Sequence, residues 1–238
     1  MFNRGLPAPV RGRARVATDP PSGGGTRKMD CVLSDQAGDF AAIYDEDVEL
    51  VSVARPASGS LDALAEHLFA TRQDVQTQWE QAAGVVDVPL AALAMRIDVE
   101  WIGALSEEIA LAGEMLSELV GCERVGVRVT TLRRPMCPRF HVDQVPCRML
   151  VTIRGPGTEW IANGDVDQTR LAARDTDAPP IRSGRDIKRL ATRNWSLLKG
   201  GTWDNRFGGV VHRSPHGTDE RLLLSFDPIF ENRAEPSS

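Results

Sequence analysis

The chain has 238 residues, of which 42% are hydrophobic, so it can form one large domain or two small ones with a real core. It has no apolar run of the roughly 20 residues that a membrane span requires, and its N-terminus lacks the apolar segment of a signal peptide, so we expect a cytoplasmic protein without a membrane partner. The four cysteines form no Cys-x-x-Cys pair and suggest reduced thiols rather than a disulfide framework.

Charge divides the chain into a basic N-terminal segment and an acidic remainder. Residues 1–28 hold six Arg or Lys and one Asp, a charge of +5, which leaves −10 for the rest because the whole chain carries −5. An acidic body without aromatic residues interleaved on basic stretches offers little to a phosphate backbone, so we expect no nucleic-acid partner. Residues 1–30 are rich in Pro, Gly and Arg and are expected to form a disordered basic tail, with Met29 as an alternative start.

Helices are expected in the first half of the chain. Apolar residues recur at helical spacing over residues 61–83, among good helix formers. A second stretch with this periodicity covers residues 89–120 and is closed by Gly121. Residues 31–121 are therefore predicted to form a mainly helical N-terminal part.

Strands are expected after Gly121, where valines alternate with Gly, Arg and Thr in the two-residue period of a half-buried strand. Further short strands, separated by Gly-rich turns, are predicted at 147–153, 158–162, 194–198, 209–212 and 221–226. This pattern favours a β-rich, cupin-like jelly roll over residues 122–230, followed by a C-terminal tail at 231–238. The predicted fold class is α+β, with the N-terminal helices packed on this C-terminal domain, and the charged segment 164–180 is expected to be a flexible insertion between strands.

A candidate metal site begins at His141-Val142-Asp143. Residues i and i+2 of an extended segment point to the same side, so the imidazole and the carboxylate can converge on one ion. His212 ends an apolar stretch that has little other use for an imidazole, and it is the expected third ligand, with His216 as its rival. Two imidazoles and one carboxylate form a facial triad that leaves positions open for substrate, co-substrate or oxygen, which indicates catalysis.

Arg221 is a second candidate binding residue, because it begins an apolar strand. A guanidinium that faces a barrel interior is costly unless it pairs with a carboxylate, and the missing carboxylate can belong to a ligand. Arg139 and Arg148 flank the ligand pair and are expected as solvated rim charges, with binding of an acidic substrate as the alternative, and Arg213 is expected as a salt-bridge or rim residue. The tryptophans are expected in the core, with lining of a substrate pocket as the alternative: Trp160, Trp195 and Trp203.

The His-x-Asp pair, the distal His and the Arg on the following strand resemble the signature of the iron(II)- and 2-oxoglutarate-dependent oxygenases. The resemblance implies a double-stranded β-helix in which His141, Asp143 and His212 hold Fe(II). It also implies that Arg221 grips the distal carboxylate of 2-oxoglutarate. The stretch from Gly155 to Trp160, Gly-Pro-Gly-Thr-Glu-Trp, is weakly similar to a segment that follows the first ligand pair in prolyl-hydroxylase-like members.

The chain after residue 120 also resembles an uncharacterised bacterial family, domain of unknown function 1826. The motifs that carry this resemblance are Cys137-Pro-Arg-Phe-His-Val-Asp143, Gly155-Pro-Gly-Thr-Glu-Trp160, Val211-His-Arg-Ser-Pro215 and Arg221-Leu-Leu-Leu. The family brings no established activity. Its members tend to occur beside zinc-homeostasis genes, which implies zinc or metal limitation as a biological context.

Two features leave alternatives open. Several oxygenase subfamilies place a Ser or Thr two residues after the Arg, where this chain has Leu223, so Ser225 on the same strand face is the expected substitute. A thiolate from Cys137, four residues before His141, or from Cys147, four residues after Asp143, could complete a closed zinc site with the same three ligands. The hypotheses are a non-haem Fe(II), 2-oxoglutarate-dependent dioxygenase-like protein acting on an unidentified small molecule or protein, a zinc-binding protein of metal homeostasis without redox turnover, and a cupin-like domain without metal.

Overall fold

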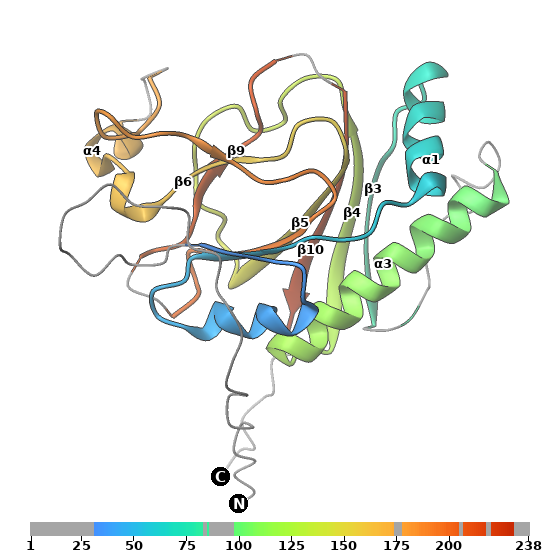
Figure 1. Cartoon of the computed structure of the whole chain (residues 1–238), viewed down its shortest axis with the longest axis horizontal. Coiled ribbons are helices and arrows are strands. Elements are labelled where there is room, and N and C mark those ends of the chain that lie inside the picture. The colour runs from blue at the N-terminus through green and yellow to red at the C-terminus, as the bar shows by residue number, and fades with distance from the viewer. Residues whose placement is uncertain are drawn as a thin grey trace, which may run out of the picture.

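The computed structural model describes residues 31–82, 85, 98–173, 178–204, 207–217 and 220–230 (Figure 1). Seven strands form the larger sheet, in the spatial order β1 (Cys31–Ser34), β2 (Leu50–Val53), β8 (Trp195–Lys199), β5 (Cys147–Arg154), β10 (Arg221–Ile229), β4 (Arg124–Leu132) and β3 (Gln76–Ala82). Three strands form the smaller sheet, in the order β7 (Lys188–Arg189), β6 (Glu159–Ile161) and β9 (Val211–Arg213). The helical elements are η1 (Ala37–Tyr44), α1 (Gly59–Ala70), α3 (Val99–Val120), η2 (Asn163–Asp165) and α4 (Gln168–Ala172).

The layers are α1 and α3, then the larger sheet, then the smaller sheet (Figure 1). The main apolar core lies between the helices and the larger sheet, where Ile109 of α3 and Leu64 of α1 share one buried cluster with Phe226 of β10. A second cluster joins the two sheets, with Leu150 of β5 packed near Trp160 of β6. The protein is therefore a sheet-rich α+β fold of jelly-roll type.

Local sequence sets the helix ends. The side chain of Ser58 accepts a hydrogen bond from the backbone of Leu61 at the start of α1, and Asp98 accepts one from Glu100 at the start of α3. The predicted stop of the second helix is confirmed, because Gly121 ends α3 with a left-handed φ of 71°. The first part of that predicted helix, at 86–97, lies outside the described residues.

The predicted helix over 61–83 is wrong in its second half. Helix α1 ends at Ala70, and Gln76–Ala82 is instead the edge strand β3, paired antiparallel with β4. Past Leu68 this stretch has few apolar residues to extend a helical stripe, and Trp79 and Gln81 turn inward at the two-residue spacing of a strand while Gln78 and Glu80 are exposed. The sequence pattern does not predict this edge strand, because the inward face of the strand is only partly apolar.

Six predicted strands are confirmed: β4, β5, β6, β8, β9 and β10. The early strands β1 and β2 were not predicted, since each has four residues and β2 is buried on both faces, which removes the alternation that marks a strand. The expected insertion at 164–180 holds the short helix α4 and a bridge between Val166 and Ile181. All three tryptophans named above pack in the cores, as expected.

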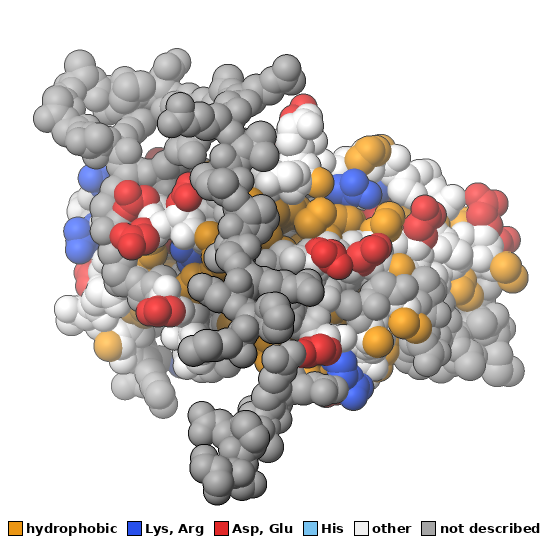
Figure 2. Space-filling model, turned by 90° about the horizontal axis from the view of Figure 1, so that it is seen from below, with side chains coloured by type: hydrophobic (Ala, Val, Ile, Leu, Met, Phe, Trp, Pro, Cys, Tyr) orange, Lys and Arg blue, Asp and Glu red, His pale blue; other side chains and the backbone are white. Residues whose placement is uncertain are grey.

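On the face seen from below in Figure 2, acidic, basic and apolar side chains are interspersed. Within the described part of the chain, none of the helices combines the length and the hydrophobicity that a bilayer crossing needs.

Candidate metal centre

His141 and His212 are held side by side by their own backbones. The N–H of each residue donates to the carbonyl of the other, at 3.0 and 2.9 Å, which forms an antiparallel bridge between the segment before β5 and strand β9. The two ring centroids are 4.6 Å apart. Residues 71 positions apart in the chain thus present their imidazoles as one pair.

Backbone carbonyls select the tautomer of both histidines. Nδ1 of His141 lies 3.0 Å from the carbonyl oxygen of Arg139, and Nδ1 of His212 lies 3.0 Å from that of Val210. Because a carbonyl oxygen can only accept, we assign the proton of each neutral ring to Nδ1. Each Nε2 then carries a lone pair, and this arrangement is usual for metal-ligating histidines.

Asp143 completes the cluster. Its Oδ1 lies 3.6 Å from Nε2 of His141 and its Oδ2 lies 3.2 Å from Nε2 of His212. One ligand atom from each of the three residues falls within 4.8 Å of the others. Converging lone pairs and a carboxylate require a cation or a shared proton between them, and this donor set fits a divalent metal ion with open positions.

Electrostatics keep Asp143 ionised. Burial opposes its charge, but without a bound ion Nε2 of His141 and of His212 can take up a proton and donate it to the carboxylate, and these hydrogen bonds and the charge of Arg148 hold the pKa of Asp143 well below its ordinary value. The hydrogen bond to Asp143 raises the pKa of His141, although burial acts in the opposite direction. The carboxylate is therefore present in the anionic form that a metal ion binds.

Arg148 of β5 anchors this carboxylate. It makes a two-pronged contact with Asp227 of β10, at 2.6 and 2.8 Å, and its Nη1 lies 2.8 Å from Oδ2 of Asp143. Oδ2 is buried and, despite this ion-pair distance, has no well-directed hydrogen bond. Arg148 therefore fixes the position of Asp143 through its charge, while a lone pair of Oδ2 remains available.

Glycines allow the loop that carries Asp143 to lie against the end of β8. The N–H of Gly201 donates to the carbonyl of Asp143 at 2.8 Å. A Cβ at Gly200 would overlap the carbonyl oxygen of Val145, and one at Gly209, whose φ is 94°, would lie 2.5 Å from Cγ1 of Val142. Only residues without a side chain fit at this contact.

A cavity of about 70 Å³ opens beside the cluster. The inner face of the larger sheet forms its floor, through Thr130, Leu150, Leu223 and Ser225. His141 and His212 line its wall, and three arginines face it: Arg128, Arg148 and Arg213. Thr158 also lines it and connects it to Arg221, since the Thr158 hydroxyl accepts from the Arg221 guanidinium at 3.3 Å.

Arg221 is a buried cation without a carboxylate partner among the described residues. The residue is 3% exposed, and its only described hydrogen bonds are long ones from Nη2, to the hydroxyls of Thr152 and Thr158, at 3.4 and 3.3 Å. Its Nε and Nη1 are buried without hydrogen-bond partners. Burial, and then the nearby charge of Arg189, lower the pKa of Arg221 to about 10. This guanidinium fits an anionic ligand group.

The structure separates the remaining candidates. Ser225 lines the cavity on the same face as Leu223, but the hydroxyls that reach Arg221 are those of two threonines. Cys137 is exposed and lines the rim of the cavity, and it is not part of the three-residue cluster. His216 instead lies 2.6 Å from the guanidinium of Arg213.

Sequence reasoning missed the roles of Arg148, Thr152 and Thr158. Arg148 was expected as a solvated charge at the rim, but its side chain is half-buried and anchored by an ion pair with Asp227. The signal was present, because two charged residues on neighbouring apolar strands need each other, but the strand register that pairs them was not available from periodicity. Thr152 and Thr158 carry no pattern that distinguishes them from ordinary strand residues.

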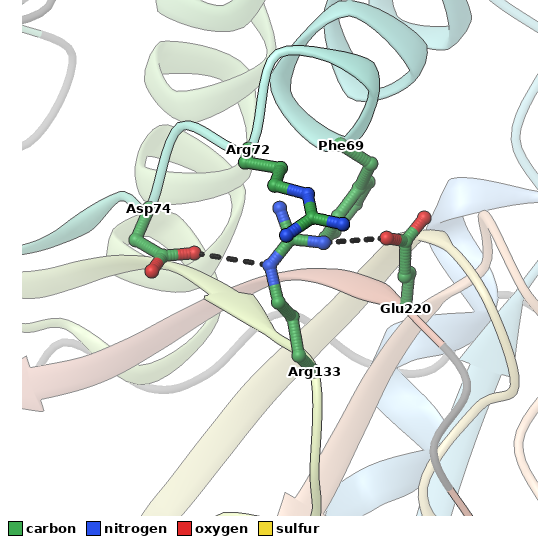
Figure 3. Close-up of a pocket in the computed structure, with 5 residues that line it drawn as sticks. All are labelled: Phe69, Arg72, Asp74, Arg133 and Glu220. Carbon is green, nitrogen blue, oxygen red and sulfur yellow. Dashed lines mark hydrogen bonds and ion pairs between the residues drawn. The ribbon is translucent and has the colours of Figure 1, made fainter.

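A larger cavity of about 610 Å³ lies elsewhere, between the end of α1 and the ends of β4 and β10 (Figure 3). Arg133 crosses it, 3.3 Å from Asp74 and 2.6 Å from Glu220, with Arg72 and Phe69 beside it. Its acidic and basic groups largely neutralise each other. It has none of the three clustered ligands.

The fold and the site define a jelly-roll-type protein with an open cluster of two histidines and one carboxylate. A model of the family described as "Protein of unknown function (DUF1826)" matches residues 34–227. The chain belongs to this family, as the match covers most of its length. No curated protein matches it.

Solved oxygenase structures align with most of the chain at low identity. The dioxygenase for auxin oxidation of rice is 14% identical, with 81% of this chain and 78% of its own covered and a TM-score of 0.48. The 2-oxoglutarate complex of dioxygenase for auxin oxidation 1 of Arabidopsis thaliana is 10% identical, with 84% and 90% covered and a TM-score of 0.48. A prolyl-4-hydroxylase of Pseudomonas putida is 8% identical, with 81% and 98% covered and a TM-score of 0.45. At these values, function must be argued from the site.

Proposed function

We propose that the protein is a non-haem Fe(II), 2-oxoglutarate-dependent dioxygenase built on a double-stranded β-helix. His141, Asp143 and His212 are the proposed ligands of the metal, and Arg221 is the proposed partner of the distal carboxylate of 2-oxoglutarate. The supporting observation is that an open three-ligand cluster and a buried, under-paired guanidinium flank one cavity.

The protein's own groups would orient the reactants. The two carbonyl-bonded histidines present Nε2 to the ion, and Arg148 keeps Asp143 from turning away. Thr152 and Thr158 hold the Arg221 guanidinium beside the cavity. Bound iron and 2-oxoglutarate supply the chemistry, in which O₂ and the 2-oxo acid give succinate, CO₂ and one oxygen atom for the substrate.

The zinc-storage alternative is less well supported. A closed structural zinc site has four protein ligands, usually including thiolates. The described cluster has three ligands and lacks Cys137. Burial first, and then the nearby Cys122 and Asp227, raise the pKa of Cys147 to about 12, so this thiol is a packing residue rather than a ready metal ligand.

Release of ¹⁴CO₂ from 1-¹⁴C-labelled 2-oxoglutarate tests this function without a known substrate. Enzymes of this class decarboxylate 2-oxoglutarate at a low rate even when no substrate is oxidised. We expect O₂-dependent release with Fe(II) that is abolished in His141→Ala and Arg221→Met. His67→Ala is the matched control, since His67 lies on α1 beside Trp101, away from the cluster, and should leave the rate unchanged. Release that survives in both site variants would contradict the proposal.

A further inference from the structure

We propose that Arg128 is a second anion-binding residue of this cavity and that the substrate carries a carboxylate or phosphate group bound there. The inference rests on the proposed function and names the chemical class of its substrate. The arginines that face the cavity differ in whether the protein places an acidic group beside them.

Two of these arginines are neutralised by the protein. Arg148 pairs with Asp227 and Asp143, and Nε of Arg213 lies 2.8 Å from Oε2 of Glu159. Arg128 differs, because among the described residues its side chain has only a neutral partner, the amide oxygen of Gln78, which accepts from Nε at 3.0 Å. Of the three arginines that line the cavity, Arg128 is the one that the described residues leave without an acidic partner.

The bond to Gln78 also orients the guanidinium. It uses Nε and leaves both Nη groups for a ligand, which is the forked geometry that binds carboxylate or phosphate through two hydrogen bonds. Gln78 lies directly opposite Arg128 in the pairing of β3 with β4, so the edge strand holds the arginine in place. Anchoring of this kind lowers the entropy cost of binding a ligand.

Arg128 and Arg221 cannot both serve the same small co-substrate. Arg221 pairs with Leu132 and Ser225 pairs with Arg128, so the two arginines are four residues apart along paired strands, or roughly 13 Å. Their guanidinium groups also lean apart, toward Gln78 of β3 and toward Thr152 of β5. A five-carbon diacid bound at Arg221 therefore leaves Arg128 for another ligand.

Calorimetric titration of the full-length protein, with saturating 2-oxoglutarate to occupy Arg221, tests this inference. Inorganic phosphate and acetate are the two probes, and they distinguish a phosphate site from a carboxylate site. We expect saturable binding of at least one probe and a loss of about tenfold or more in affinity in Arg128→Gln. Arg128→Lys keeps the charge but loses the fork, and should bind the probe with intermediate affinity.

Arg124→Gln is the matched control, because Arg124 lies on the same strand, is exposed and pairs with Glu80 at 3.2 Å. It should bind the probe as the parent does. The inference is overturned if neither probe binds the parent, or if Arg128→Gln binds as tightly as Arg124→Gln.

Failure of the proposed function would look different. In that case metal binding would be unaffected by His141→Ala, or 2-oxoglutarate binding would be unaffected by Arg221→Met, whatever the Arg128 variants do. Conversely, intact metal and 2-oxoglutarate binding with no effect at Arg128 would reject only the substrate class.

Discussion

The two cavities of this protein differ in size and in how their charges are satisfied. The larger one, about 610 Å³, is crossed by Arg133, whose side chain is 34% exposed and pairs with two acids (Figure 3). The smaller one, about 70 Å³, lies beside a buried arginine that has buried nitrogens without a partner. Cavity size alone favours the larger cavity, whereas charge favours the smaller one: Arg133 has two acidic partners, and Arg221 has none among the described residues.

The largest expected effect comes from removing a ligand. His212→Ala should weaken Co(II) binding by more than about 100-fold, because loss of a residue that only hydrogen-bonds to a metal ligand already costs about 10- to 100-fold. His216→Ala is the matched control, because His216 contacts Arg213 rather than the cluster. Visible spectra of the Co(II) complexes measure both, and equal affinities in the two variants would remove His212 from the site.

Arg221→Met should weaken 2-oxoglutarate binding by roughly 100-fold, because two or more charge-assisted hydrogen bonds are lost. The same change should raise the free energy of unfolding by about 1 to 3 kcal/mol, since it removes a buried cation without a described acidic partner. Calorimetry gives the affinity and urea unfolding gives the stability. A less stable variant would mean that the guanidinium is paired in the free protein.

Arg148→Met sharpens the contrast between paired and unpaired arginines. Breaking its ion pairs leaves Asp227 and Asp143 uncompensated and should lower the free energy of unfolding by about 3 kcal/mol. Metal affinity should fall by about 10- to 100-fold, because Asp143 loses its anchor. Asp227→Asn, which loosens Arg148 without touching a ligand, should reproduce part of the loss in affinity; unchanged affinity in both variants would make Arg148 purely structural.

Gly200→Ala should displace the loop that carries Asp143, because the added Cβ meets the Val145 carbonyl. We expect a loss of about 1 to 3 kcal/mol in the free energy of unfolding, with weaker metal binding. At Gly103 of α3 a Cβ meets nothing within 4 Å, so Gly103→Ala should raise that free energy by about 0.5 to 1 kcal/mol and leave metal binding unchanged. Tight metal binding by Gly200→Ala would show that the loop tolerates the shift.

The smallest effect is expected in the larger cavity. Arg133→Met should change the free energy of unfolding by less than about 1 kcal/mol, because its ion pairs are partly exposed. Metal and 2-oxoglutarate affinities should be the same as in the parent. A clear loss of 2-oxoglutarate affinity would link the two cavities through Glu220, which directly precedes Arg221.

The candidate ligands could be predicted from the sequence because their signal is local or chemically unusual. His141 and Asp143 are two residues apart, and His212 is an imidazole that ends an apolar strand. The structure brings these three together, as expected, and leaves Cys137 outside the cluster.

The supporting residues could not be predicted because their role depends on strand register. The contact of Arg148 with Asp227 and that of Arg128 with Gln78 join residues that are neighbours only once β5, β10, β4 and β3 have paired. The edge strand β3 was itself mistaken for helix, which hid Gln78. Short buried strands such as β2 likewise lack the alternation on which prediction depends.

The most direct test of the proposed function is an anaerobic titration of the metal-free protein with Fe(II) and then 2-oxoglutarate. Two-point binding of a 2-oxo acid to iron produces a weak visible charge-transfer band. We expect the band in the parent and in Arg133→Met, and its loss in Arg221→Met at the same 2-oxoglutarate concentration. No band in the parent, together with tight Zn²⁺ binding, would contradict the dioxygenase function and make the three residues a zinc site.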